Sequence, residues 1–365
     1  MALCLSNFKS KFTCEQTVAD CALKFFVLAI CVLFLNGCAS LEPVELPDEF
    51  TPSPSQTRIW QSLDADYKDN WQDDWFVLLN DGLTALDWRL RAIDTATQNI
   101  DLQTFLWTFD TTGSLVLDRL VEAADRGVKV KLLIDDSFLA GEDEILLQLH
   151  RHPNIEYRVY NPFKRRTTSS ATRWALNLAE FGRLDHRMHN KAMVIDNRIA
   201  IVGGRNLADE YFGLHEKGNF RDMELIVGGP IVRQISKAFD TYWNDDWVIP
   251  IDYLSHVKTS PADLDAARKV REQEVHLHSE ETEAERLQQW QSLIQNSVRG
   301  NARLLVDEPP KANPAELSEA PVQVANALEN IFNNAKQEIL IVSAYLIPTS
   351  RICLLYTSPS PRDEL

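Results

Sequence analysis

Apolar residues recur along positions 82–254 in two alternating periods, which predict helices and strands in turn. We expect helices at residues 82–97, 112–126 and 231–243, and strands at residues 100–107, 128–134, 155–160 and 223–227. Thr112 is the expected N-cap of the second helix and Gly127 its expected stop. Strands that alternate with helices predict an α/β fold, a sheet with helices on both faces.

A β-hairpin is expected around the dipeptide Asp196-Asn197. Residues 191–195 are apolar apart from their ends, and residues 198–202 alternate back. A tight turn at Asp196-Asn197 would pair these two runs. In a strand, Asp196 would lie on the face opposite to His189 and Lys191, so we interpret it as a turn or support residue.

One face at the open end of this hairpin would carry groups that suit a phosphate site. With a two-residue period, His189 and Lys191 lie on the same face, about 7 Å apart along the strand. The turn would bring Gly203 and Gly204 roughly opposite them, with Asn206 beside the pair. A nucleophile, a cation and closely approaching backbone together suit an oxyanion.

The run RMHNKAMVIDNRIAIVGGRNLADEYFG resembles the phospholipase D superfamily, and most closely its bacterial cardiolipin synthase branch. His, Lys, Asp, paired Gly and Asn stand at the family spacing, which is a specific signal. The family often has Gly-Ser where this chain has Gly203-Gly204, so the backbone would supply the missing donor. The resemblance implies a mixed sheet flanked by helices, in two repeats that each give one HxK motif to a shared site.

The resemblance also implies phosphatidyl transfer through a phosphohistidine, with phosphatidylglycerol as the expected lipid substrate and no cofactor or metal. His189 would be the nucleophile or its acid partner, while Lys191, Asn206 and nearby amides neutralise the phosphate. Asp222 stands where the family places the acid that orients the nucleophile. The alternative for Asp222 is a surface acid at a strand edge.

Net charge separates some classes of partner. The chain has 365 residues and a formal charge of −16, which argues against a nucleic-acid partner held on a basic surface. A local exception leads into the motif and is either a solvated loop or a funnel for anionic headgroups. Its basic residues are Lys164, Arg165, Arg166, Arg173, Arg183 and Arg187.

Residues 1–37 resemble a bacterial lipoprotein signal peptide. An apolar run at residues 25–35 ends in Leu-Asn-Gly-Cys, which resembles a lipobox with Cys38 as the lipidated residue. Residues 38–70 would then be a tether to the membrane, and Gram-negative sorting favours the outer membrane. An ordinary secretory signal or a short anchor is the alternative.

The rest of the chain is divided by an internal repeat. Residues 92–106 and 330–346 share a helix-to-strand signature, offset by about 240 residues, which would place a second HxK motif beyond Leu365. We therefore expect a first domain at 71–254, a charged helical linker without a core face at 255–300, and the start of a truncated second domain at 301–351. Residues 352–365 resemble a translated sequencing adapter; the alternative is a Ser/Pro-rich tail.

Three functions remain open at this point. The first is a cardiolipin synthase-type phosphatidyltransferase, and the second is a phosphodiesterase of the same fold, either phospholipase or nuclease. The third is a non-catalytic lipoprotein scaffold. A zinc site at His186 and His189 is disfavoured, because a three-residue spacing on a strand puts them on opposite faces. Asp135-Asp136 could bind a cation, but a turn explains them more simply.

Overall fold

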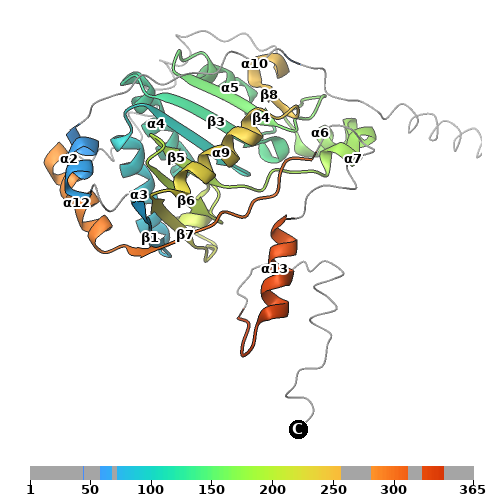
Figure 1. Ribbon diagram of the computed structural model, residues 1–365. Helices are drawn as coiled ribbons and strands as arrows, with labels where there is room; N and C mark the ends of the chain where they lie inside the picture. The colour runs from blue at the N-terminus through green and yellow to red at the C-terminus, as the bar shows by residue number, and fades with distance from the viewer. Residues whose placement is uncertain (1–43, 45–57, 68–71, 256–280, 311–322, 341–365) are drawn as a thin grey trace, which may run out of the picture.

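One mixed sheet of nine strands organises the part of the chain that the computed structural model describes, residues 44, 58–67, 72–255, 281–310 and 323–340. The strand order is β8-β4-β3-β2-β5-β6-β7-β1-β9 (Figure 1). The strands are β1 (Asp74–Leu79), β2 (Asn99–Thr104), β3 (Lys129–Asp135), β4 (Ile155–Tyr160), β5 (Ala192–Ile195), β6 (Ile199–Gly203), β7 (Glu224–Gly228), β8 (Val248–Pro250) and β9 (Val298–Gly300).

The sheet has a parallel centre and antiparallel flanks. Strands β2, β3 and β4 are parallel, and helices α4 and α5 make the two crossovers between them. The remaining pairs are antiparallel, including the β5–β6 hairpin that lies against β2. The carboxyl ends of the three parallel strands therefore open onto one edge of the sheet, where ligands of such sheets commonly bind.

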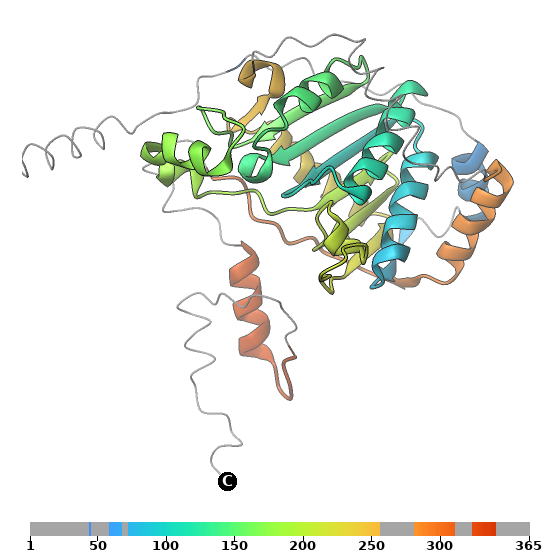
Figure 2. The ribbon, with the colours of Figure 1, turned by 180° about the vertical axis from the view of Figure 1, so that it is seen from behind.

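Helices cover both faces of the sheet, as the alternation in the sequence predicts. Figure 2 shows α3, α4 and α5 on one face, and Figure 1 shows α9 across the other. The helices are α2 (Arg58–Tyr67), α3 (Gly82–Thr95), α4 (Thr111–Asp125), α5 (Asp143–His150), α6 (Ser170–Leu176), α7 (Phe181–Leu184), α8 (Asp209–Phe212), α9 (Ile231–Trp243), α10 (Ile251–Leu254), α12 (Glu283–Gln295) and α13 (Gln323–Asn334), with short 3₁₀ turns η2 (Asp136–Phe138) and η3 (Leu178–Glu180). The α/β class is confirmed.

Helix α9 shows why the sequence pattern was informative. Ile231, Ile235, Phe239 and Tyr242 recur three or four positions apart, and all four are buried. The first two pack on Val194 of β5 in one apolar cluster with β6 and β7. Helix α9 therefore packs on the hairpin from the face of the sheet opposite α3 and α4.

Two local expectations were wrong. The N-cap of α4 is Asp110, whose carboxylate accepts a hydrogen bond from Gly113 N, and not Thr112. Asp is as good an N-cap as Thr, and the Asp110 backbone is extended there. Strand β2 ends at Thr104 rather than at Trp107, which makes only an isolated bridge to Leu207. Gly127 does follow α4 with a positive φ of 96°, as expected.

Helices α2 and α12 lie inside ranges that we expected to be a tether and a linker without a core face. Trp290 of α12 is fully buried, and its ring lies 6.2 Å from that of Trp60 in α2. Its indole nitrogen also donates to Thr95 of α3, at 2.9 Å. The linker range is helical at α12, as expected, but α12 does have a buried face, and residues 58–67 form a packed helix rather than a tether. A few apolar side chains among many charges suffice to pack a helix.

Residues 301–310 and 323–340 belong to the range expected to begin a second domain. Ala302 N donates to Asp74, and Tyr242 donates to the Asp307 carbonyl, so the first of these segments packs on the sheet and α9. Helix α13 falls where the repeat predicts a helix, and its side chains are not buried. The expected signal peptide, Cys38 and the adapter-like residues lie outside the described residues. Within the described ranges, no helix is long and apolar enough to cross a membrane.

Candidate active site

The β5–β6 hairpin carries the candidate motif at its open end. Ala192 pairs with Val202 and Ile195 with Ile199, so residues 196–198 form the turn, and Arg198 N donates to the Ile195 carbonyl across it at 2.9 Å. Asp196 and Asn197 have φ of 51° and 52°, in the left-handed region that tight turns between twisted strands use. Asp and Asn tolerate positive φ better than most residues, which explains the sequence at this turn.

The Asp196 carboxylate ties the closed end of the hairpin to the neighbouring elements. It accepts hydrogen bonds from the indole of Trp60 at 2.7 Å and from the hydroxyl of Thr97 at 2.8 Å. The backbone amides of residues 97–99 donate to the same carboxylate. Asp196 therefore lies in the turn and away from the open end, and its many donors offset the unfavourable burial of a charge.

His189 and Lys191 lie just before β5, not within the strand that we expected to carry them. Their side chains nevertheless meet, since Lys191 Nζ lies 3.3 Å from His189 Nδ1 and donates to the His189 carbonyl at 2.7 Å. Pairing of the hairpin stops at Ala192, one residue later. The backbone of His189 and Lys191 is thus free of the ladder, and their side chains converge at the edge of the sheet.

Phe105 forms a platform under both side chains. Its ring centroid lies 4.4 Å from that of His189, and Lys191 Nζ lies 5.4 Å from it on the ring face. A cation over an aromatic face is held without a neutralising carboxylate. Phe138, which follows β3, contacts Phe105 edge-on at 5.4 Å and is 52% exposed. Sequence reasoning missed Phe105; its position directly after β2 was the available signal.

The electrostatics of the pair favour an uncharged imidazole next to a cation. Partial burial, together with the charge of Lys191, lowers the pKa of His189. Burial lowers the pKa of Lys191 to about 8, while the charges of Asp222 and Asp135 oppose this. At neutral pH, His189 is therefore mostly neutral and Lys191 mostly protonated, the states that a nucleophile and a phosphate ligand need.

Asp135 fixes the backbone that leads into His189, a role that the sequence did not reveal. Its fully buried carboxylate accepts from Met188 N at 2.9 Å and pairs with Arg187 Nε at 3.3 Å. It also accepts from the amide and hydroxyl of Ser137, as the cap of the turn after β3. Burial raises the pKa of Asp135 to about 6, and the charge of Arg187 opposes the shift.

The absence of side chains at Gly203 and Gly204 allows β7 and the residues before it to approach closely. A Cβ on Gly203 would overlap the backbone of Met223, and one on Gly204 would overlap the carboxylate of Asp222. The amide of Gly204 donates to the Met223 carbonyl at 3.2 Å, so in this structure it is used within the sheet. The expected role of Gly203 and Gly204 in phosphate binding stays a prediction, with the Gly204 amide already used by the Met223 carbonyl.

Asp222 and Asn206 both lie near the open end of the hairpin. The Asp222 carboxylate accepts from Met223 N at 2.7 Å and is close enough to act on the charge of Lys191. Within the described residues, no hydrogen bond joins Asp222 to His189. Asn206 is buried and its Oδ1 accepts from Leu106 N at 3.1 Å, which leaves its Nδ2 without a partner among those residues.

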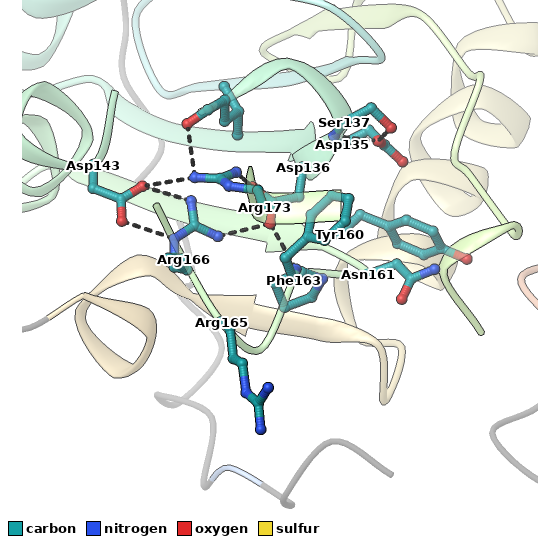
Figure 3. Close-up of polar contacts among 12 residues, drawn as sticks. Asp135, Asp136, Ser137, Asp143, Tyr160, Asn161, Phe163, Arg165, Arg166 and Arg173 are labelled. Atoms are coloured by element: carbon teal, nitrogen blue, oxygen red, sulfur yellow. Dashed lines mark hydrogen bonds and ion pairs between the residues drawn. The ribbon is translucent and has the colours of Figure 1, made fainter. Parts of the chain in front are cut away.

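The basic segment before the motif is neither a solvated loop nor a funnel. Arg166 and Arg173 pair with the fully buried Asp136, at 2.7 and 3.0 Å, and Arg166 also reaches Asp143 (Figure 3). Arg183 pairs with Glu180 and Arg187 with Asp135. Only Lys164 and Arg165 are exposed among the six basic residues expected to form the funnel. Buried carboxylates far away in sequence explain the difference.

Metal ligation has no support in the part of the chain that the structure describes. No group of three or more His, Cys, Asp or Glu residues there could hold a metal ion. Asp135 and Asp136 serve the turn after β3 and its ion pairs, in agreement with the simpler interpretation. His186 bonds the carbonyl of Gly182 through Nδ1, at 3.0 Å.

Comparison with known proteins assigns the family. Residues 90–243, from α3 to the end of α9, match the family described as "Cardiolipin synthase, PLD-like domain". An uncharacterized protein of Helicobacter pylori strain J99 is 31% identical over 346 residues, 92% of this chain and 67% of its own length. Cardiolipin synthase C of Escherichia coli K12 is 32% identical over 280 residues, 74% of this chain and 57% of its own length. The chain belongs to the phospholipase D superfamily.

Solved structures give a further comparison. Nuc from Salmonella typhimurium, a phospholipase D family member, covers 48% of this chain and 96% of its own, at 19% identity and a TM-score of 0.32. Phosphatidylserine synthase of Haemophilus influenzae Rd KW20 covers 64% of this chain and 50% of its own, at 14% identity and a TM-score of 0.38. The chain itself spans little more than half the length of the Escherichia coli relative.

Proposed function

We propose that this chain supplies one HxK motif to a phosphatidyltransferase of the cardiolipin synthase type, which joins a phosphatidyl group to phosphatidylglycerol. The observation that carries the proposal is the contact between His189 and Lys191 on the Phe105 platform, where the imidazole is neutral and the ammonium charged. Similarity to Cardiolipin synthase C and to the matching family supports a phospholipid as the substrate class.

The chemistry follows from these protonation states. Phosphodiester oxygens repel nucleophiles, so the charge of Lys191 and the free Nδ2 of Asn206 would neutralise the non-bridging oxygens. The His189 nitrogen attacks phosphorus, the bond to the leaving glycerol oxygen breaks, and an acid protonates that oxygen. An incoming alcohol then breaks the N–P bond and gives its proton to the same group. The lowered pKa of His189 supports the nucleophile role over the acid role.

The acid would come from a second HxK motif. By the offset between residues 92–106 and 330–346, we expect such a motif about 240 residues after His189. A second copy of this chain is the other source, because one motif per chain can pair across a symmetric interface. In either case Asp222 would orient a histidine only in the assembled site, since in this chain it does not bond His189.

Membrane location is part of the proposal and rests on sequence alone. The lipobox-like residues before Cys38 would attach the protein to the membrane that holds its substrate, with the outer membrane favoured. The expected absence of a nucleic-acid substrate likewise rests on the net charge of −16.

The test compares two nearby histidines. Membranes from cells that express the full-length gene are incubated with phosphatidylglycerol, and cardiolipin is measured by mass spectrometry. His189→Ala should reduce cardiolipin formation by about a thousandfold or more, the scale of losing a nucleophile. His186→Ala, three residues earlier, should stay within about threefold of wild type.

Other products in the same assay decide between related activities. Undiminished cardiolipin in the His189→Ala sample would reject the assignment. Phosphatidic acid instead of cardiolipin, despite added alcohol, would make the protein a phospholipase. Cleavage of added DNA that depends on His189 would reject the expected exclusion of nucleic acid.

A further inference from the structure

Residues 173–181 are arranged opposite to an ordinary surface segment. Arg173, Asn177 and Glu180 are 1%, 1% and 9% exposed, whereas Leu176, Leu178 and Phe181 are 44%, 57% and 52% exposed. A surface helix normally buries its apolar side chains and exposes its polar ones. The buried polar residues recur at helical spacing along α6 and η3, so the inversion runs from Arg173 to Phe181, while α7 buries the apolar Leu184.

The inward polar residues hold the segment in a fixed position. Arg173 pairs with Asp136 and donates to the Leu139 carbonyl, as Figure 3 shows for the ion pair. Asn177 accepts from Arg165 N at 2.9 Å and donates to the Arg173 carbonyl at 2.7 Å. These polar contacts fix the backbone that carries Leu176, Leu178 and Phe181. The exposure of these apolar side chains is therefore not the result of loose packing.

Charge indicates what this surface meets. The exposed charged residues at positions 164–185 are the basic Lys164 and Arg165, and Asp185 at the end of α7, in a chain with a net charge of −16. Arg165 points away from the buried carboxylates in Figure 3. Apolar side chains flanked by exposed cations complement an anionic lipid surface, where the apolar groups enter the acyl boundary and the cations meet headgroups.

The segment is also adjacent to the candidate active site. Arg173 binds the turn after β3, and Phe138 of that turn contacts Phe105 beneath His189. Figure 1 shows α6 and α7 projecting from the end of the sheet where β3 and β4 finish. A lipid surface in contact with this projection would lie next to His189.

We propose that Leu176, Leu178 and Phe181, with Lys164 and Arg165, form a docking surface for anionic lipid bilayers. This inference rests on the proposed function, since the bilayer is where a phosphatidyl substrate lies. It assigns to α6, η3 and α7 a contact with the membrane that is separate from the expected lipid anchor.

The test measures hydrogen exchange in the segment itself, so that membrane attachment through an N-terminal anchor is not mistaken for binding by this surface. Hydrogen exchange of the full chain is followed by mass spectrometry with and without vesicles of phosphatidylglycerol or phosphatidylcholine. Backbone amides of residues 170–184 should exchange about tenfold more slowly with phosphatidylglycerol vesicles, and less so with phosphatidylcholine. Unchanged exchange with both vesicles would overturn the proposal.

Variants separate the apolar and the charged contributions. The double variant Leu178→Glu with Phe181→Glu should lose the protection, while Leu83→Glu, at an equally exposed leucine on α3, should keep it. Lys164→Glu with Arg165→Glu should remove the preference for phosphatidylglycerol. Circular dichroism confirms that each variant is folded.

Two further outcomes distinguish this proposal from its alternatives. If Leu178→Glu with Phe181→Glu changes the mass of the protein in light scattering, the surface binds protein and the lipid proposal fails. His189→Ala should leave the protection intact. Protection in that variant without any transferase activity in the wild type would reject the proposed function alone.

Discussion

The two ends of the β5–β6 hairpin are built on opposite principles. At the closed end, Asp196 is surrounded by donors from α2 and from the residues that enter β2. At the open end, Lys191 is half-buried, and the bonds it makes join it to His189 alone among the described residues. The charge of Asp196 is thus fully hydrogen-bonded, whereas the charge of Lys191 lies against the ring of Phe105.

This difference indicates that the closed end of the hairpin contributes to stability and the open end to reactivity. A buried carboxylate with several donors contributes to folding because each donor would otherwise lose its partner. A buried ammonium without a carboxylate partner is unfavourable in the folded state, and its lowered pKa reports this. An incoming phosphate would supply the missing negative charge. The open end is therefore suited to bind an anionic ligand.

Among changes that compare the two ends, removal of the open-end charge should have the largest effect on activity. Lys191→Met should lower the transferase rate by about a hundred- to a thousandfold, the scale of losing a donor to a developing oxyanion. The melting temperature should stay the same or rise, because the buried charge is gone. Initial rates of cardiolipin formation and thermal unfolding of the same preparation check both statements. A variant that keeps its rate would show that Lys191 does not contact phosphate.

At the closed end, the same kind of change should affect stability instead. Asp196→Ala should lower the free energy of unfolding by about 2–4 kcal/mol, because buried donors lose their acceptor. Chemical denaturation measures this loss. Asn197→Gly is the matched control at the same turn and should change stability by less than about 1 kcal/mol, since Gly adopts positive φ readily. The rate per folded molecule should stay within about twofold in both; a large fall in Asp196→Ala would contradict the division between the ends.

Local patterns were sufficient for the parts of the molecule that depend on neighbours in sequence. The turn at Asp196-Asn197, strand β4 and helix α9 follow from residue type and period, and all three lie where expected. His189 and Lys191 also meet, as expected, although neither lies in a strand, because β5 begins at Ala192.

Contacts between distant residues could not be predicted in this way. Arg173 looks like part of a solvated basic loop until Asp136, 37 residues earlier, is placed beside it. Helix α12 shows only three buried residues in a charged stretch, and its partner α2 lies more than 200 residues earlier. The role of Asp135 depends likewise on the backbone of Met188, 53 residues later. A sequence gives the residue types in such networks, but not which of them become neighbours.

A smaller effect is expected where the sheet supports the open end. Asp135→Asn keeps an oxygen for Met188 N but removes the charge that pairs with Arg187. We expect about a tenfold fall in kcat with little change in KM, because His189 would be less well positioned while lipid binding is retained. Steady-state kinetics test this split. If KM rises and kcat does not change, Asp135 acts on substrate binding and not on the position of His189.

Between pH 7 and pH 8, the pH dependence of activity is the smallest effect, and it tests the comparison of the two ends most directly. Lys191 has a pKa of about 8, so its charge is lost as the pH rises through 8, and activity should fall about twofold between pH 7 and pH 8 and then about tenfold per pH unit. Stability should respond with the opposite sign. Between pH 8 and the ordinary value of 10.5, the unfolded Lys binds a proton that the folded one does not, so this group makes folding more favourable as the pH rises.

Lys191→Arg separates the two responses to pH. Its guanidinium stays charged, so the alkaline fall in activity should move to higher pH while the contribution to stability disappears. Rate profiles and unfolding measured in the same buffers follow both. If the alkaline limb stays near pH 8 in Lys191→Arg, another group sets it, and the open end of the hairpin does not work through the charge of Lys191.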